Sequence, residues 1–174
     1  VVDGRPVCYW VNQRDRQVPL DAGFVGVVNS TGITVRDLTL EKSDPGVLFA
    51  YTNDSRIENV TVSHNDRGIR LINSFNNVVT GNRATSNSEG ISLDQSSHNT
   101  IAGNEVALND LCGVRLQSSL HNTVSDNSVT SNQEDGILLE SGSGHNTVSG
   151  NTVSENGVGI SLDSSSSDNT LYHN

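Results

Sequence analysis

The chain has 174 residues, of which 33% are hydrophobic and only 4% aromatic, and both values are low for a globular core. Its formal net charge is −10 and Lys42 is its only lysine, which disfavours nucleic acids and anionic membranes as partners. No apolar run is long enough to span a bilayer, and the length allows one domain or a segment of a longer protein.

Residues 1–24 do not follow the pattern of the rest of the chain, and they contain Tyr9 and Trp10. The end of a repeat array exposes strand edges and core, so a terminal unit has to cover them. We therefore expect residues 1–24 to form an N-terminal cap or an irregular first coil. Residues 25–174 are expected to form the repeats, as a segment of a longer protein.

A tetrad of glycine, apolar residue, any residue and apolar residue recurs every 22 or 23 residues. Its glycines are Gly46, Gly68, Gly90, Gly113, Gly136 and Gly159. This period fits leucine-rich repeats and parallel β-helices. Apolar residues alternate with period two and helical spacing is absent, which indicates strands. The sequence therefore predicts an all-β fold, a single-stranded right-handed parallel β-helix of about six to seven coils.

Asparagines recur at the same interval, and one column contains Asn82, Asn104, Asn127 and Asn151. Asparagine tolerates the left-handed backbone conformation of a sharp corner. An inward amide can also bond to the same amide one coil away, which satisfies buried polar groups. We interpret this column as a structural ladder, and we expect the repeated glycine to permit a bend before each first strand.

Three parts of the sequence resemble the NosD-type periplasmic copper-binding family. They are the stretch Asp3-Gly4-Arg5-Pro6-Val7-Cys8-Tyr9-Trp10, residues 22–35, and the repeats Gly-Ile-x-Leu followed by His/Asn-Asn-Thr-Val-x-x-Asn. The chain is also similar to the carbohydrate-binding and sugar-hydrolysis (CASH) repeats of archaeal and bacterial surface proteins. The resemblance implies a right-handed parallel β-helix in an extracellular, cell-surface or periplasmic location. It also implies a polysaccharide or copper as partner.

The outward positions of the first strands contain Asp94, Arg115 and Glu140, with Arg70 on the same face. An acid near a base suits proton abstraction beside a carboxylate, and paired acids suit glycoside cleavage. The three residues are therefore candidate catalytic residues of a polysaccharide lyase, hydrolase or epimerase. The alternative is a non-catalytic ladder in which opposite charges on neighbouring strands stabilise the sheet.

His98, His121 and His145 each precede a repeated asparagine, so they stack on successive coils. Imidazole is a natural ligand for Cu²⁺ and Zn²⁺, and the family resemblance favours copper. The alternative is a set of stacked or solvated turn residues, because a well-formed site needs a third ligand and supporting hydrogen bonds, and neither is visible.

Other metal-binding or redox signals are weak. Acidic turn residues could bind Ca²⁺, but they lack the spacing of a calcium loop. They are Asp66, Glu89, Glu134 and Asp135. Cys8 and Cys112 lie several coils apart and are expected to be free thiols.

These patterns favour a non-catalytic extracellular β-helical domain, structural or glycan-contacting, in a cell-surface or secreted protein. A polysaccharide-active enzyme and a copper-binding or copper-delivery protein are the alternatives. No cofactor is expected apart from the copper or calcium considered above. The repeat continues to Asn174. We therefore expect the C-terminal coil either to continue into more chain or to self-associate end to end as a filament.

Overall fold

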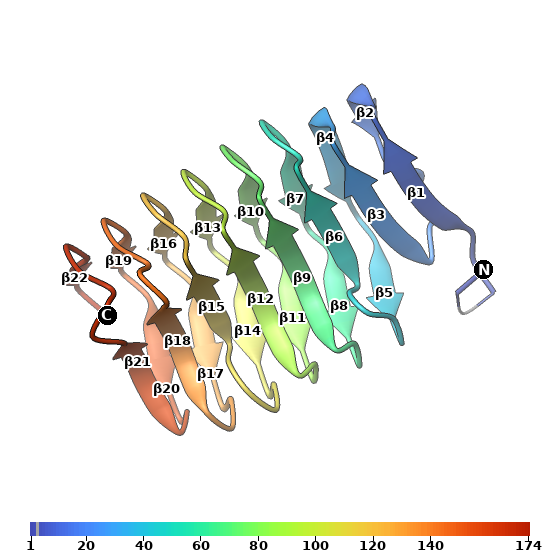
Figure 1. The fold of residues 1–174 in the computed structure, drawn as a ribbon. Helices are drawn as coiled ribbons and strands as arrows, with labels where there is room; N and C mark the ends of the chain where they lie inside the picture. The colour runs from blue at the N-terminus through green and yellow to red at the C-terminus, as the bar shows by residue number, and fades with distance from the viewer. Residues whose placement is uncertain (3) are drawn as a thin grey trace.

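The computed structural model describes residues 1–2 and 4–174; Asp3, in the first motif quoted above, lies outside the described residues. Short strands wind into a stack of coils that runs from the N-terminus to the C-terminus (Figure 1). The named strands pair in parallel within three sheets. The expected all-β parallel coil is confirmed, and no helix that could cross a membrane occurs among the described residues.

Each full coil contributes one strand to each of the three sheets. The first sheet contains β1 (Val7–Val11), β3 (Phe24–Val28), β6 (Val47–Ala50), β9 (Arg67–Ile72), β12 (Glu89–Asp94), β15 (Val114–Gln117), β18 (Asp135–Glu140) and β21 (Val158–Leu162). The second sheet contains β2 (Arg14–Gln17), β4 (Thr31–Arg36), β7 (Arg56–Glu58), β10 (Val78–Thr80), β13 (Thr100–Ala102), β16 (Thr123–Ser125), β19 (Thr147–Ser149) and β22 (Thr170–Tyr172). The third sheet contains β5 (Thr39–Glu41), β8 (Thr61–Ser63), β11 (Arg83–Thr85), β14 (Glu105–Ala107), β17 (Ser128–Thr130) and β20 (Thr152–Ser154). Among the described residues, the first and last coils therefore lack a third strand.

The N-terminal strands belong to the stack. β1 pairs with β3 from Val7 opposite Phe24 onwards, and β2 pairs with β4. Residues 7–17 therefore form an irregular two-stranded coil. The guanidinium of Arg16 lies 4.6 Å from the centre of the Trp10 ring, which is a cation–π distance.

The core is a set of aliphatic columns that point inward from all three sheets. In one coil, Ile91 and Leu93 of β12, Ile101 of β13 and Val106 of β14 are fully buried. Strand residues alternate between the two faces of a sheet, so the residues between these point outward. The outward residues are the ones available to contact other molecules.

The predicted asparagine column forms a hydrogen-bonded ladder in the interior. Asn82 Nδ2 donates to Asn104 Oδ1 at 3.0 Å, and Asn104 Nδ2 donates to Asn127 Oδ1 at 2.9 Å. Asn127 Nδ2 donates in turn to Asn151 Oδ1 at 2.9 Å. The backbone amide of each donor residue bonds to the same oxygen, so the ladder also ties the corners together.

The explanation by left-handed backbone conformation is wrong for these asparagines. The left-handed conformation occurs instead at the residue before each of them. These residues are Gly81, Gly103, Asp126 and Gly150, with φ of 62°, 64°, 57° and 66°. The corner therefore turns one residue earlier, and the turn aims the asparagine side chain inward.

The repeated glycine at the start of the first-sheet strands is required because neighbouring atoms leave no space for a Cβ atom. At Gly113, an added Cβ would lie 2.6 Å from Val129 Cγ1 and 2.7 Å from the carbonyl oxygen of Gly136. Gly113 does not have a left-handed φ. The corner between the third and first sheets is therefore packed too closely for any side chain.

A second interior ladder consists of hydroxyl groups, and the sequence analysis did not identify it. The Thr52 amide donates to Ser74 Oγ and the Ser74 amide donates to Ser96 Oγ, both at 3.0 Å. The Ser96 amide donates to Ser119 Oγ, also at 3.0 Å. These residues share the 22–23-residue spacing, which is the signal that could have revealed them.

Candidate functional site

The outer face of the first sheet carries two neighbouring columns of side chains. One column places Arg70, Ser92 and Arg115 opposite one another on β9, β12 and β15. The other column contains Ile72, Asp94, Gln117 and Glu140. We call these residues, together with Glu89 at the start of β12, the first-sheet strip.

Arg70 and Asp94 form a two-point ion pair within this strip. Arg70 Nε donates to Asp94 Oδ2 at 2.8 Å, and Arg70 Nη2 lies 2.7 Å from the same oxygen. The Asp94 side chain is only 14% exposed. Arginine holds a carboxylate firmly when two of its nitrogens reach it, so Asp94 is fixed in position.

Arg115 lies among three carboxylates. Its Nε donates to Glu140 Oε1 at 2.7 Å, and its Nη1 lies 3.5 Å from Glu89 Oε1 and 3.9 Å from Asp94 Oδ1. Its Nη2 donates to Gln117 Oε1 at 3.1 Å. Burial acts to lower the pKa of Arg115, but the hydrogen bond to Glu140 and the charges of the three acids outweigh burial and raise it. Arg115 therefore remains positively charged.

A hollow of about 310 Å³ opens beside these ion pairs at the edge of the first sheet. Its lining residues are Arg70, Ile72, Asp94, Gln95, Gln117 and Ser118. Ile72 supplies an apolar patch, and most of the other lining side chains offer hydrogen-bonding groups. This combination of an apolar surface and a few fixed polar groups is typical of small-molecule sites.

Ser92 lies between the two arginines of the strip. Its side chain points outward from β12, yet the residue is fully buried. The Ser92 hydroxyl has no hydrogen-bond partner among the described residues. A buried polar group without a partner is rare in folded proteins, and it calls for a specific explanation.

The candidate catalytic residues Asp94, Arg115 and Glu140 thus lie together. Arg115 contacts both acids, and each acid accepts from an arginine. Sequence reasoning missed Glu89 and Gln117 as further partners of Arg115. The pairing register along the strands would have placed Gln117 beside Asp94, whereas the contact with Glu89 depends on the direction of a long side chain.

The three candidate metal-binding histidines form a stack on the corner between the first and second sheets. The ring centres of His98 and His121 are 5.0 Å apart with a 13° angle, and those of His121 and His145 are 5.1 Å apart with a 9° angle. All three are exposed and have a left-handed φ. A metal bonds to imidazole nitrogen at about 2.0–2.1 Å. Such a bond lies in the ring plane, so parallel rings at this spacing would have to rotate before they could share one ion. The copper site therefore remains a prediction.

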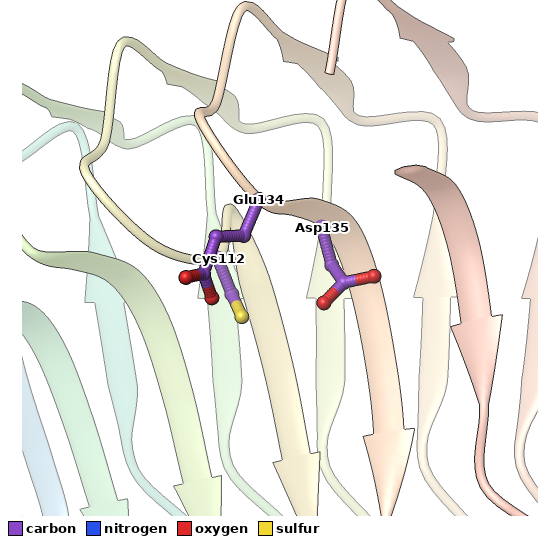
Figure 2. A group of neighbouring side chains, drawn as sticks. All are labelled: Cys112, Glu134 and Asp135. Atoms are coloured by element: carbon purple, nitrogen blue, oxygen red, sulfur yellow. The ribbon is translucent and has the colours of Figure 1, made fainter. Parts of the chain in front are cut away.

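Cys112, Glu134 and Asp135 form a separate cluster at the turns that lead into β15 and β18 (Figure 2). Their ligand atoms lie within 4.8 Å of one another. Burial, followed by the charge of Asp135, raises the pKa of the Cys112 thiol to about 11. Metals bind the thiolate, so a metal ion at this cluster would have to displace the thiol proton. Cys8 and Cys112 are both free and buried.

The model of the right-handed β-helix region matches residues 23–174, so the chain belongs to the right-handed β-helix family. The expected right-handed parallel β-helix is therefore confirmed. The narrower resemblance to NosD-type and CASH proteins remains a prediction. None of the curated proteins matches the chain.

Several solved structures share the fold. The periplasmic alginate epimerase AlgG is 23% identical over 94% of this chain and 46% of its own, with a TM-score of 0.84. The A-module of the Azotobacter vinelandii mannuronan C-5 epimerase AlgE6 is 17% identical over 92% of this chain and 57% of its own, with a TM-score of 0.66. The enzymatically active domain of tailspike protein 2 from bacteriophage CBA120 is 16% identical over 87% of this chain and 25% of its own, with a TM-score of 0.61. The chain thus covers less than two thirds of each of these structures.

Proposed function

We propose that this member of the right-handed β-helix family is a non-catalytic glycan-contacting domain of a cell-surface, secreted or periplasmic protein. The first-sheet strip is the proposed contact surface. The observation that carries the proposal is the row of polar side chains that ion pairs fix in place beside the hollow at Arg70, Asp94 and Gln117. Fixed polar groups orient hydroxyl-rich ligands because little side-chain entropy is lost on binding.

The fold of the solved structures supports a polysaccharide as the ligand. Two of them are an alginate epimerase and a mannuronan epimerase, and a third is the active domain of a phage tailspike. A straight parallel sheet presents side chains at a regular interval of about 4.8 Å, which suits contact with successive units of a chain molecule.

The ion pairs support binding rather than catalysis. A general base must reach the proton that it removes, within hydrogen-bond distance. Asp94 and Glu140 each accept from a guanidinium group at 2.7–2.8 Å, so one oxygen of each carboxylate is occupied in this arrangement. The polysaccharide-active enzyme is therefore the alternative that the test below has to exclude.

The test combines binding and turnover on the same polysaccharides. We expect calorimetry to detect binding of a glycan oligomer while chromatography of the incubated oligomer shows no change in length or composition. Replacing Gln117 by Ala should weaken binding, whereas Gln133→Ala, on the corner between the third and first sheets, should not. Formation of a product would establish the enzyme alternative, and failure of every glycan to bind would contradict the proposal.

A further inference from the structure

We propose that the first-sheet strip selects glycans that carry protonated amino groups over glycans that carry carboxylates. The proposal rests on the proposed function and names the chemical class of its ligand. It departs from what the alginate and mannuronan epimerases would suggest, because alginate and mannuronan are polysaccharides that carry carboxylates. Three observations carry it: the use of the Arg115 donors, the unused acceptor sites of the acids, and the unpartnered Ser92 hydroxyl.

The guanidinium group of Arg115 has few donors left for an acidic ligand. A guanidinium carries five N–H donors. Arg115 directs its nitrogens to Glu140, Glu89, Asp94 and Gln117, so all three nitrogens have acceptors. A sugar carboxylate at Arg115 would become a fourth carboxylate around a single positive charge. Repulsion by the three resident carboxylates therefore opposes a uronate at this position.

The carboxylates of the strip, by contrast, keep acceptor sites that no neighbouring donor among the described residues uses. Glu89, Asp94 and Glu140 face Arg70 and Arg115, and Glu89 also accepts a hydrogen bond from Arg67 Nε at 3.2 Å. A carboxylate has about four lone-pair sites, and the contacts described above use only some of them. Glu140 accepts from Arg115 through Oε1, and its second oxygen makes no hydrogen bond with the described residues. An ammonium group has only donors to offer, so it complements this surface.

The Ser92 hydroxyl is a further sign of a ligand, independent of the charges. It is fully buried and points outward between Arg70 and Arg115, with no partner among the described residues. A hydroxyl group can accept a hydrogen bond from an amine or a sugar hydroxyl once an arginine side chain moves aside. A ligand that displaced Arg70 or Arg115 would gain the carboxylates above and this hydroxyl below.

The charge of the whole chain acts in the same direction. The formal net charge is −10, so the mean potential around the protein attracts cations and repels polyanions. This long-range contribution is screened by salt over about 8 Å at physiological ionic strength. Contacts within the strip are screened less, so a variant with a change in the strip can separate the two effects.

The experiment compares three tetrasaccharides by calorimetry at mildly acidic pH and low salt: tetraglucosamine, tetra-N-acetylglucosamine and tetramannuronate. Under these conditions the amine is protonated while most Asp and Glu side chains remain ionised. We expect tetraglucosamine to bind at least about tenfold more tightly than its acetylated form, because a hydrogen bond to a charged group is stronger than one between neutral groups. Tetramannuronate should bind most weakly.

Two variants separate the strip from the overall charge. Glu140→Gln should weaken tetraglucosamine binding about tenfold. The matched control Glu105→Gln, which removes the same charge from the third sheet, should change it less than twofold. Arg115→Gln should strengthen tetraglucosamine binding because it releases the Glu140 oxygen that accepts from Arg115. If Arg115 instead recognised a sugar carboxylate, Arg115→Gln should abolish binding of tetramannuronate. A gain in tetraglucosamine binding and a loss of tetramannuronate binding therefore distinguish recognition of an amine from recognition of a carboxylate.

The outcomes also separate this inference from the proposed function. Equal binding of the amino and acetylated tetramers, unaffected by Glu140→Gln, would overturn the inference and leave glycan contact intact. Tighter binding of tetramannuronate would also overturn it. An equal loss in Glu140→Gln and Glu105→Gln would assign the preference to overall charge and contradict the strip. Binding of none of the three oligomers would contradict the proposed function as well.

Discussion

The interior ladders and the first-sheet strip are built from polar side chains on the same coils, but they follow opposite rules. Inside, the same residue type recurs on successive coils from Asn82 to Asn174, and each amide meets an identical amide one coil away. Outside, Arg70, Ser92 and Arg115 occupy equivalent positions with different chemistry. The interior repeats because its partners are copies of itself. The outer face is free to vary, and its variation is what can give the protein a specific ligand.

The largest expected effect comes from breaking the interior ladder. Replacing Asn127 by Ala removes the acceptor of Asn104 and the donor to Asn151 and to the Ile101 carbonyl. Each buried group left unpaired costs about 1–3 kcal/mol in the free energy of unfolding. Chemical denaturation should show the loss, and Ser128→Ala, on the exposed next residue, serves as the control. Equal stability of the two variants would contradict the structural interpretation of the ladder.

The second effect tests the space around the glycine column. Gly113→Ala places a methyl group at about 2.6–2.8 Å from Val129, Gly136 and Asn132. Overpacking of this kind costs about 1–3 kcal/mol. The melting temperature should fall, whereas Gly81→Ala meets no atom within 4 Å and should lose only the backbone preference of its left-handed φ. A Gly113→Ala protein as stable as the wild type would show that the corner can relax.

The third effect concerns the first-sheet strip, and here the change in the free energy of unfolding should be small and of opposite sign. Ser92→Ala removes a buried hydroxyl that has no partner. The variant should therefore be as stable as the wild type or up to about 1 kcal/mol more stable, since no hydrogen bond is lost. Urea denaturation measures the difference. A clear loss of stability would mean that Ser92 has a structural partner and would weaken its role as a ligand contact.

The smallest effect is local and depends on pH. Asp163 accepts hydrogen bonds from Ser166 Oγ, the Ser141 amide and the Ser165 hydroxyl and amide, and these lower its pKa from 3.8 to about 2. A lowered folded-state pKa stabilises the fold at pH values above 3.8, and this contribution is lost as the pH falls from about 4 to about 2. NMR titration of the Asp163 carboxyl should give its folded-state pKa. A midpoint near 4 would contradict the hydrogen bonds at this turn.

The fold was predictable because the residues that recur in the sequence are those whose side chains point inward or shape the corners. The spacing of Gly90, Gly113 and Gly136 and of the ladder asparagines identified the coils, and the period-two alternation identified the strands. The physical role of the glycine was not predictable in this way. Its contacts come from the Gly136 carbonyl group on the next coil and from Val129 in the third sheet, which are far away in the sequence.

The candidate site was predictable only in part. Strand register follows from the repeat, so Asp94, Arg115 and Glu140 could be placed on one face. The direction of long side chains does not follow from register, and it decides that Arg115 reaches Glu89 and that Ser92 is covered. The histidine stack shows the same limit, because the spacing predicts the column but the ring planes depend on the left-handed corner.

Because the interior ladders repeat the same residues on successive coils, neighbouring coils are interchangeable. From β3 onwards, each strand pairs with the strand 22 to 24 residues away, as in Val79 with Ile101 and Val124 with Val148, and each pair presents the same surface to the next. Removing or duplicating one whole coil would create no new kind of internal contact, so such a protein can change its length in evolution without redesigning its core. The same property permits mispairing by a full coil during folding. Only the irregular N-terminal strands and the varied outer side chains distinguish the correct alignment from its neighbours.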